Sequence, residues 1–297
     1  MAQIYNYLYD TPGMRSRIIL TLTLLLIFYV KPSSGMEDID PRVLIISPQV
    51  ALPVGIKIWF NECGGEVMGL TSWNTGEDFA SLGIGHFLWH PYPSKRATSN
   101  SGFPHLLRYM QERGVDIPYW LQGNNGLYCP WSNRSEFLNA QYSSKMIALR
   151  NFLQKTIPIQ AEYMTRHLQE ILPDLLASTP MEERWLIHDK FYSLARTPAG
   201  IYALVDYLNF KGAGTGKTRH NYEHGSGLLQ VLRGMKFAPP NYSPLQAYVW
   251  SAKNALIRRV ERSASSKYTE RWLAGWFNRL NTYLDGDAKT PTGIAIN

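Results

Sequence analysis

The two stretches Asn61-Glu62-Cys63-Gly64-Gly65 and Ser81-Leu82-Gly83-Ile84-Gly85-His86 decide the fold of this chain. The first closes an apolar segment that begins after Pro53. Because glycine favours the C-terminal end of a helix, we expect a helix that ends at Cys63. β-forming residues and glycines at 67–73 and 79–89 predict two short strands. Between them, residues 74–78 (Asn-Thr-Gly-Glu-Asp) have the composition of a turn. The sequence therefore predicts a helix followed by a β-hairpin.

Most of the chain beyond this hairpin has helical periodicity. Apolar residues at helical spacing predict helices around 103–110, 249–260 and 272–283, and further helical segments are expected near 136–155, 159–176, 182–196 and 199–207. There is no internal repeat and no linker. We therefore expect a single α+β domain over residues 36–297, mostly helical, with a small β-hairpin lobe beside the helix that carries Glu62.

Composition restricts the class of protein. With 45% hydrophobic and 18% charged residues, the 297-residue chain is not expected to be disordered. Its formal net charge of +7 favours anionic partners, which could be nucleic acid, membrane headgroups or an acidic cell-wall polymer. Lys and Arg are scattered, without a run of like charges, so the charge indicates tolerance of polyanions and no more. We expect a monomer and no nucleic-acid partner.

Residues 1–35 have the parts of a secretory signal peptide. Arg15 and Arg17 precede an apolar stretch at 18–30, and small residues follow it. The segment before Met14 contains no basic residue, which makes Met14 the expected start. The apolar stretch is shorter than the ~20 residues that cross a bilayer, so no stable membrane span is expected after processing. This signal predicts a bacterial protein that is periplasmic or secreted.

The predicted export affects the expected oxidation state of the two cysteines, Cys63 and Cys129. In an oxidising compartment they can pair, whereas in the cytosol they would stay reduced. Sequence spacing does not show whether they approach each other, so the sequence does not decide whether a Cys63–Cys129 disulfide forms.

Glu62 is the residue best placed for chemistry. Cleavage of a glycosidic bond needs a proton donor beside the leaving oxygen and a second group that activates water or stabilises the positive sugar. Apolar neighbours such as Trp59 and Phe60 are expected to raise the pKa of Glu62 and make it a donor. Glu77 or Asp78, in the hairpin turn, could be the second group.

These stretches resemble the phage-type lysozymes and their lysozyme-like relatives, in which a helix ends in the catalytic Glu and a hairpin and a Gly-x-Gly-His strand follow. The resemblance covers about 30 residues. It implies that Glu62 is the general acid, that Ser81 replaces the family's water-positioning Thr, and that His86 is structural. The hairpin here is longer than in the family, and the family's hairpin Asp has no clear counterpart among Asn74, Glu77 and Asp78. If none of these serves, the chain would resemble lytic transglycosylases, which use one acid and the sugar's own hydroxyl.

Several other side chains are candidates for substrate binding. Aromatic side chains could stack on sugar rings, and a polar set could line the far wall of a cleft; the candidates are Trp73, Asn74, His86, Trp89, Asn209, Lys211, Tyr222 and Gln230. A glycine-rich loop is expected at 211–227.

Two other site types are weighed against this interpretation. Residues 209–218 nearly spell a phosphate-binding loop, but Lys211 stands where its first glycine is required, and a helix rather than a strand is expected before it. Residues 225–231 look like the Gly-Leu-Met-Gln signature of lytic transglycosylases, but they lie too far from Glu62. No His-Glu-x-x-His motif is present, so neither a metal nor a cofactor is expected.

The sequence therefore predicts a peptidoglycan-active glycosidase that cleaves between amino sugars by general acid catalysis from Glu62. The first alternative is a non-catalytic lysozyme-fold protein that binds glycans or acts as a scaffold of the cell envelope. The second is a cytoplasmic ATPase that uses the loop at 209–218.

Overall fold

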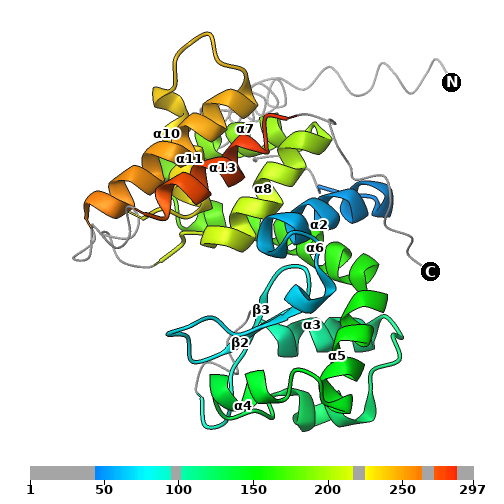
Figure 1. Ribbon diagram of the computed structural model, residues 1–297. Helices are drawn as coiled ribbons and strands as arrows, with labels where there is room; N and C mark the ends of the chain where they lie inside the picture. The colour runs from blue at the N-terminus through cyan, green and yellow to red at the C-terminus, as the bar shows by residue number, and fades with distance from the viewer. Residues whose placement is uncertain (1–43, 95–101, 217–224, 263–270, 286–297) are drawn as a thin grey trace, which may run out of the picture. The chain divides into compact units, whose positions relative to one another are not determined.

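The structure is a computed structural model that describes residues 44–94, 102–216, 225–262 and 271–285 (Figure 1). The predicted signal peptide and Tyr222 lie outside the described residues. The described chain is mostly helical and contains a small three-stranded antiparallel sheet, so the predicted α+β class is confirmed. None of the helices within these ranges is both long and apolar enough to span a bilayer.

Helix α2 (Pro48–Cys63) ends where the sequence predicts. Gly64 takes a left-handed conformation with φ 68°, and its N–H donates to the Phe60 carbonyl at 2.9 Å. This arrangement satisfies a carbonyl at the helix end, and glycine adopts it without steric cost. The predicted start after Pro53 is wrong, because the helix begins at Pro48. Ala51 is already buried in the core, so packing stabilises the first turn.

The sheet is formed by β1 (Thr71–Ser72), β2 (Ala80–Leu82) and β3 (Phe87–Trp89) in the order β1-β2-β3. Ser72 pairs with Ser81, and Ser81 pairs in turn with Leu88. The single strand expected over 79–89 is therefore wrong. A turn at 83–86 divides it, because Gly83 (φ 71°) and His86 (φ 50°) have left-handed backbones that a strand cannot contain. The expected strand at 67–73 is also shorter, since a 3-10 helix occupies Val67–Leu70.

The helices beside the sheet agree with the prediction, except that one predicted helical segment is divided into two helices. Helix α3 (Phe103–Glu112) packs on β3. The segment predicted as helical over 136–155 forms two helices, α4 (Arg134–Asn139) and α5 (Ser144–Lys155). The Ser143 hydroxyl accepts the Met146 N–H at 3.3 Å and so starts α5 as a new helix.

Helix α6 (Ile157–Ala177) connects the sheet side to the rest of the helices. It contacts α2, α3 and α5 and also two later helices, α7 (Arg184–Ala195) and α8 (Pro198–Lys211). The other α-helices within the described residues are α10 (Leu228–Gly234), α11 (Pro244–Glu261) and α13 (Leu273–Asn281), and α11 packs against both α10 and α13. Helix α8 extends beyond the expected 199–207, so Asn209 and Lys211 lie on a helix. One continuous apolar core runs from α2 to Tyr283.

Candidate active site around Glu62

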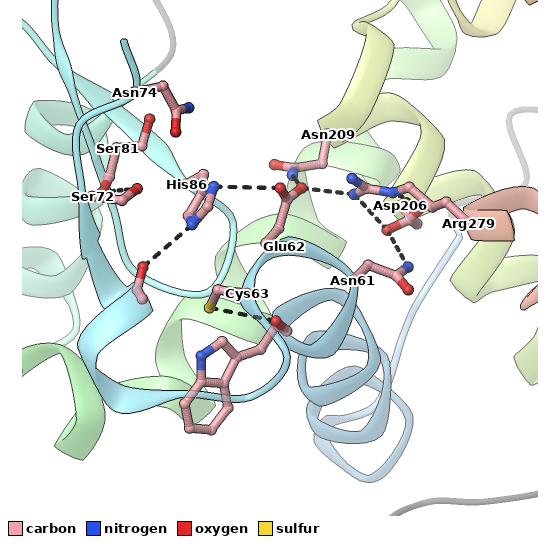
Figure 2. A network of polar contacts seen from close by, with 12 residues as sticks. Asn61, Glu62, Cys63, Ser72, Asn74, Ser81, His86, Asp206, Asn209 and Arg279 are labelled. Carbon is pink, nitrogen blue, oxygen red and sulfur yellow. Dashed lines mark hydrogen bonds and ion pairs between the residues drawn. The ribbon is translucent and has the colours of Figure 1, made fainter. Parts of the chain in front are cut away.

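Glu62 lies on the last turn of α2, and side chains from three other elements contact its carboxylate (Figure 2). Nδ1 of His86, in the turn between β2 and β3, is 3.4 Å from Oε2. On the other oxygen, Oε1, Nη2 of Arg279 from α13 donates at 2.7 Å and Nδ2 of Asn209 from α8 donates at 3.3 Å. The Glu62 side chain is only 16% exposed. A nearly buried carboxylate is thus held by two basic groups and an amide.

The turn that carries His86 is fixed to α6. The Ile84 N–H donates to Oε1 of Gln160 at 3.0 Å, and Gln160 is fully buried. A Cβ added at Gly83 would come within 2.2 Å of the same Gln160 oxygen, so the close approach requires glycine. Nε2 of His86 faces the Gly69 carbonyl at 3.3 Å. The imidazole is therefore held on both sides.

Arg279 is aimed at Glu62 by a buried carboxylate, Asp206 on α8. Nε and Nη2 of Arg279 each donate to Asp206 at 2.8 Å, and Asp206 has no exposed surface. Asp206 also accepts hydrogen bonds from the Tyr283 hydroxyl and, at 3.1 Å, from Nδ2 of Asn61. A buried charge requires this degree of pairing. The network fixes the guanidinium before any ligand binds.

The charges around Glu62 overturn one expectation from sequence. Burial acts to raise the pKa of Glu62, but the hydrogen bond from His86 and the charge of Arg279 outweigh it and lower the pKa to about 2. The pKa predicted to rise beside Trp59 and Phe60 therefore falls, because two basic side chains contact the carboxylate directly. For His86, burial acts to lower the pKa, but contacts with Cys63 and Glu62 raise it to about 9. Both shifts favour an ionised Glu62 beside a protonated His86 at neutral pH.

A cavity of about 570 Å³ is lined by two of the residues that contact Glu62. His86 and Asn209, which both contact Glu62, form part of its wall. The rest of the wall comes from the chain around β3, from α6 and from α8 and the residues after it, and includes the rings of Phe87, Tyr163 and Phe210. Clefts of this size and mixed polarity are typical of sites that bind small molecules.

The structure does not bring the carboxylate of Glu77 to Glu62. Nδ2 of Asn74 donates to the Glu77 carboxylate at 3.1 Å, and the Glu77 backbone carbonyl accepts the Trp73 indole N–H at 2.9 Å. Glu77 therefore belongs to the hairpin turn. Asp78 is exposed in the same turn. Ser81 lies on β2, and Figure 2 shows its hydroxyl pointing toward Asn74. Ser81 and Asn74 are thus grouped on the hairpin.

Two aromatic residues predicted to bind substrate are core residues. Trp73 is 4% exposed and packs edge-on against Phe137, and Trp89 is fully buried against Phe103. The Trp89 indole N–H donates to the Gly126 carbonyl at 3.0 Å. The prediction that these rings stack on sugars is therefore wrong, because both face the interior of the domain.

Gln230 and Lys211 also differ from their predicted roles. Gln230 is buried; it donates to the Gly214 carbonyl at 3.0 Å and accepts the Gly227 N–H, so it fixes the ends of the glycine-rich segment. Nζ of Lys211 lies 3.8 Å from the ring centroids of both Phe210 and Trp276. Burial, with the charges of Arg259 and Arg279, lowers the pKa of Lys211 to about 7. Neither residue is an exposed polar contact of a cleft wall.

The open question of a disulfide is answered against pairing, since Cys63 and Cys129 are both free thiols. Sγ of Cys63 faces the Trp59 and Glu66 carbonyls at 3.6 and 3.8 Å. Cys129 is buried, which raises the pKa of its thiol to about 12. Among the described residues, no group of three or more His, Cys, Asp or Glu side chains could hold a metal ion.

Sequence reasoning missed Asp206, Arg279 and Asn61. One signal was present: Asp206 is the single charged residue in the otherwise apolar run 200–208. A charge on such a helix is buried only with a partner, so the run predicts a nearby cation. It does not predict which arginine, because Arg279 is 73 residues away.

Comparison of the chain with protein-family models, with curated proteins and with solved structures finds no match.

Proposed function

We propose that this chain is a peptidoglycan-active glycosidase of the lysozyme-like kind, in which Glu62 protonates the glycosidic oxygen between amino sugars. One observation carries the proposal: a nearly buried carboxylate at the end of α2 is held by residues from three distant segments, and two of these residues, His86 and Asn209, line a cavity of about 570 Å³. Groups positioned in this way before a ligand binds are typical of active sites.

The lining of the cavity fits a sugar polymer. Partly exposed aromatic side chains such as Tyr163 and Phe210 offer surface to the faces of sugar rings, and His86 and Asn209 offer polar contacts to hydroxyl and amide groups. The formal net charge of +7 suits the anionic wall in which such a polymer occurs. An exported protein, as residues 1–35 predict, would meet this substrate.

The hairpin supplies the second function of the site in this proposal. Asn74 is exposed there and Ser81 beside it is only 3% exposed, so in this proposal the Asn74 amide, supported by the Ser81 hydroxyl, would hold the attacking water or the reacting end of the glycan. Because Glu77 is bound within the turn, a second carboxylate is not part of the proposal. A single acid is also the arrangement in lytic transglycosylases.

A second candidate is a lysozyme-fold protein that binds glycans without cleaving them. It is favoured by the low pKa of Glu62, about 2, because an ionised carboxylate accepts hydrogen bonds from sugar hydroxyls but has no proton to donate.

Digestion of purified bacterial peptidoglycan separates the two. The full chain, Glu62→Gln and the control Glu66→Gln, which changes an exposed residue just beyond α2, are incubated with the polymer, and the products are identified by mass spectrometry. Cleavage by the wild type and Glu66→Gln but not by Glu62→Gln supports the glycosidase. Reducing or anhydro ends then distinguish hydrolase from transglycosylase. Cleavage by Glu62→Gln excludes Glu62 as the acid, and binding without cleavage by the wild type favours the second candidate.

A further inference from the structure

Both ring nitrogens of His86 face hydrogen-bond acceptors. Nε2 is 3.3 Å from the Gly69 carbonyl, and Nδ1 is 3.4 Å from Oε2 of Glu62. A backbone carbonyl can only accept, so the contact with Gly69 requires a proton on Nε2. The neutral imidazole carries one proton, and the carbonyl therefore selects the tautomer whose Nδ1 is a free acceptor.

Nδ1 and Oε2 are 3.4 Å apart, so the two atoms can hold one further proton between them. It lies either on Nδ1, which gives an ion pair, or on Oε2, which gives a neutral carboxylic acid that donates to Nδ1. Both arrangements keep every hydrogen bond of the imidazole. The two atoms thus form a pair that holds one proton and can place it on either side.

We infer that His86 stores the proton that Glu62 delivers to the substrate, which makes His86 a positioning residue of the proposed glycosidase. This inference rests on the proposed function for its last step. It explains how a carboxylate that is ionised in the free protein becomes a proton donor.

The charged and titratable groups around the pair favour the stored form in the free protein. Arg279, held by Asp206, donates to Oε1 of Glu62 and stabilises the carboxylate, and the Cys63 thiol adjoins His86 on the α2 side. Lys211 on α8 is the other basic group near Glu62. The pKa of about 2 for Glu62 and of about 9 for His86 agree with a proton on Nδ1.

A glycan in the cavity would reverse this preference. It displaces water from the wall that His86 and Asn209 form, and an ion pair is less stable relative to its neutral form when water is excluded. The proton moves from Nδ1 to Oε2 and then to the glycosidic oxygen, whose bond to the sugar carbon breaks with the electron pair on oxygen. Water adds to that carbon and releases one proton, which returns to the pair. The cycle consumes water and restores the stored proton.

The backbone keeps His86 in place during this cycle. Its φ of 50° and the hydrogen bond from Ile84 to the buried Gln160 fix the turn, so the imidazole does not swing away when its charge changes. An asparagine at position 86 tolerates the same left-handed backbone and retains an amide donor toward Glu62, but it cannot store a proton.

The first test observes the proton without any substrate. The ¹⁵N signals of the His86 imidazole, identified as those that vanish in His86→Asn, are followed from pH 5 to 10 in the wild type and in Glu62→Gln. We expect both nitrogens to be protonated at pH 7 in the wild type, and a lower pKa for His86 in Glu62→Gln. A neutral His86 at pH 7, or a titration that Glu62→Gln leaves unchanged, overturns the inference. This test needs no glycan, so it is independent of whether the proposed substrate is correct.

The second test is the pH dependence of glycan cleavage by the wild type, His86→Asn and the control His105→Asn, which lies on α3. With the stored proton removed, we expect activity at pH 7 to fall about 100-fold and then to recover about ten-fold per unit as pH decreases toward 5, while the wild type and the control stay level. A loss of the same factor at every pH would show a purely structural histidine and overturn the inference. If the wild type cleaves no glycan while the imidazole shows the shared proton, the proposed function fails and the pair stands.

Discussion

Arg279 binds Asp206 at two points: its Nε donates to one carboxylate oxygen and its Nη2 to the other, both at 2.8 Å. The same Nη2 also reaches Glu62 at 2.7 Å. Because the planar guanidinium can satisfy both contacts in only one orientation, Asp206 determines where Arg279 points. The geometry around Glu62 therefore depends on a carboxylate that no substrate is required to touch.

We expect Asp206→Ala to lower the free energy of unfolding by about 3–5 kcal/mol, because the substitution leaves the guanidinium of Arg279 nearly buried with half of its pairing lost. Urea denaturation measures the effect. Asp189→Ala, which removes an exposed carboxylate on α7, is the control and should change stability by less than about 0.5 kcal/mol. A loss below about 1 kcal/mol for Asp206→Ala would show that the network is dispensable to the fold.

Stability should depend on pH in two directions around Glu62 and His86. Since the pKa of Glu62 is lowered to about 2, its contribution is present above about pH 4.5 and is lost as pH falls toward 2. Since the pKa of His86 is raised to about 9, its contribution is present below about pH 6.5 and is lost as pH rises through 9. The free energy of unfolding should therefore be roughly constant between about pH 4.5 and 6.5, and each group should lower it by on the order of 3 kcal/mol beyond its end of this range. Chemical denaturation across pH should show that Glu62→Gln flattens the acidic limb; an unchanged limb would assign it to other carboxylates.

Lys211→Met should stabilise the protein at pH 7 and below. Because burial lowers the pKa of Lys211 to about 7, the folded state disfavours its charge. Lys211 therefore destabilises the fold at pH 7 and below, and this penalty decreases as pH rises from 7 toward 10.5. Contacts with the rings of Phe210 and Trp276 offset part of this cost. We expect a gain of about 1–3 kcal/mol at pH 6 in thermal or urea unfolding, and a smaller gain at pH 10. A destabilised variant would mean that the aromatic contacts outweigh burial.

Gln160→Met should weaken both the fold and the site. Gln160 accepts from the Ile84 N–H at 3.0 Å and donates to the Leu153 carbonyl at 2.6 Å. Methionine leaves the Ile84 N–H without a partner, whereas the Leu153 carbonyl still accepts from the Thr156 hydroxyl at 3.3 Å. We expect a loss of about 1–3 kcal/mol. Glycan cleavage should also decrease under conditions where the variant is fully folded, because the turn that carries His86 loses its anchor. Gln154→Met, at an exposed position on α5, is the matched control; equal effects of the two variants would contradict the anchoring role.

Trp89→Phe should lower stability without changing glycan affinity. The indole N–H donates to the Gly126 carbonyl, and the ring packs in the core, so we expect a loss of about 1–3 kcal/mol. Glycan binding, measured with Glu62→Gln in both backgrounds, should stay within about two-fold. A larger decrease in affinity would show that Trp89 contributes to glycan binding.

Sequence reasoning succeeded where structure is local. The helix end at Cys63 was predicted from two glycines, and the turn at 74–78 from its polar residues, because a few neighbouring residues determine such features. It failed at His86, whose left-handed backbone depends on contacts of its turn with Leu70 and Gln160 rather than on residue type.

The burial of Trp73 and Trp89 was also beyond the sequence. An aromatic residue in a strand suits either the core or a cleft, and only the face that the sheet turns inward decides between them. The residues around Glu62 show the same limit over longer distances, because Asn209 and Arg279 reach it from 147 and 217 residues away.

The separation of Glu62 from Arg279 also has a consequence for the growing chain. Helix α13, which carries Arg279, packs against α11 near the end of the described residues, whereas α2 is the first described helix. During synthesis Glu62 and Asp206 both emerge well before the guanidinium that joins them. Until α13 docks, Glu62 and Asp206 lack the guanidinium that donates to both of them, so a polypeptide that ends before α13 cannot form the pairing described around Glu62.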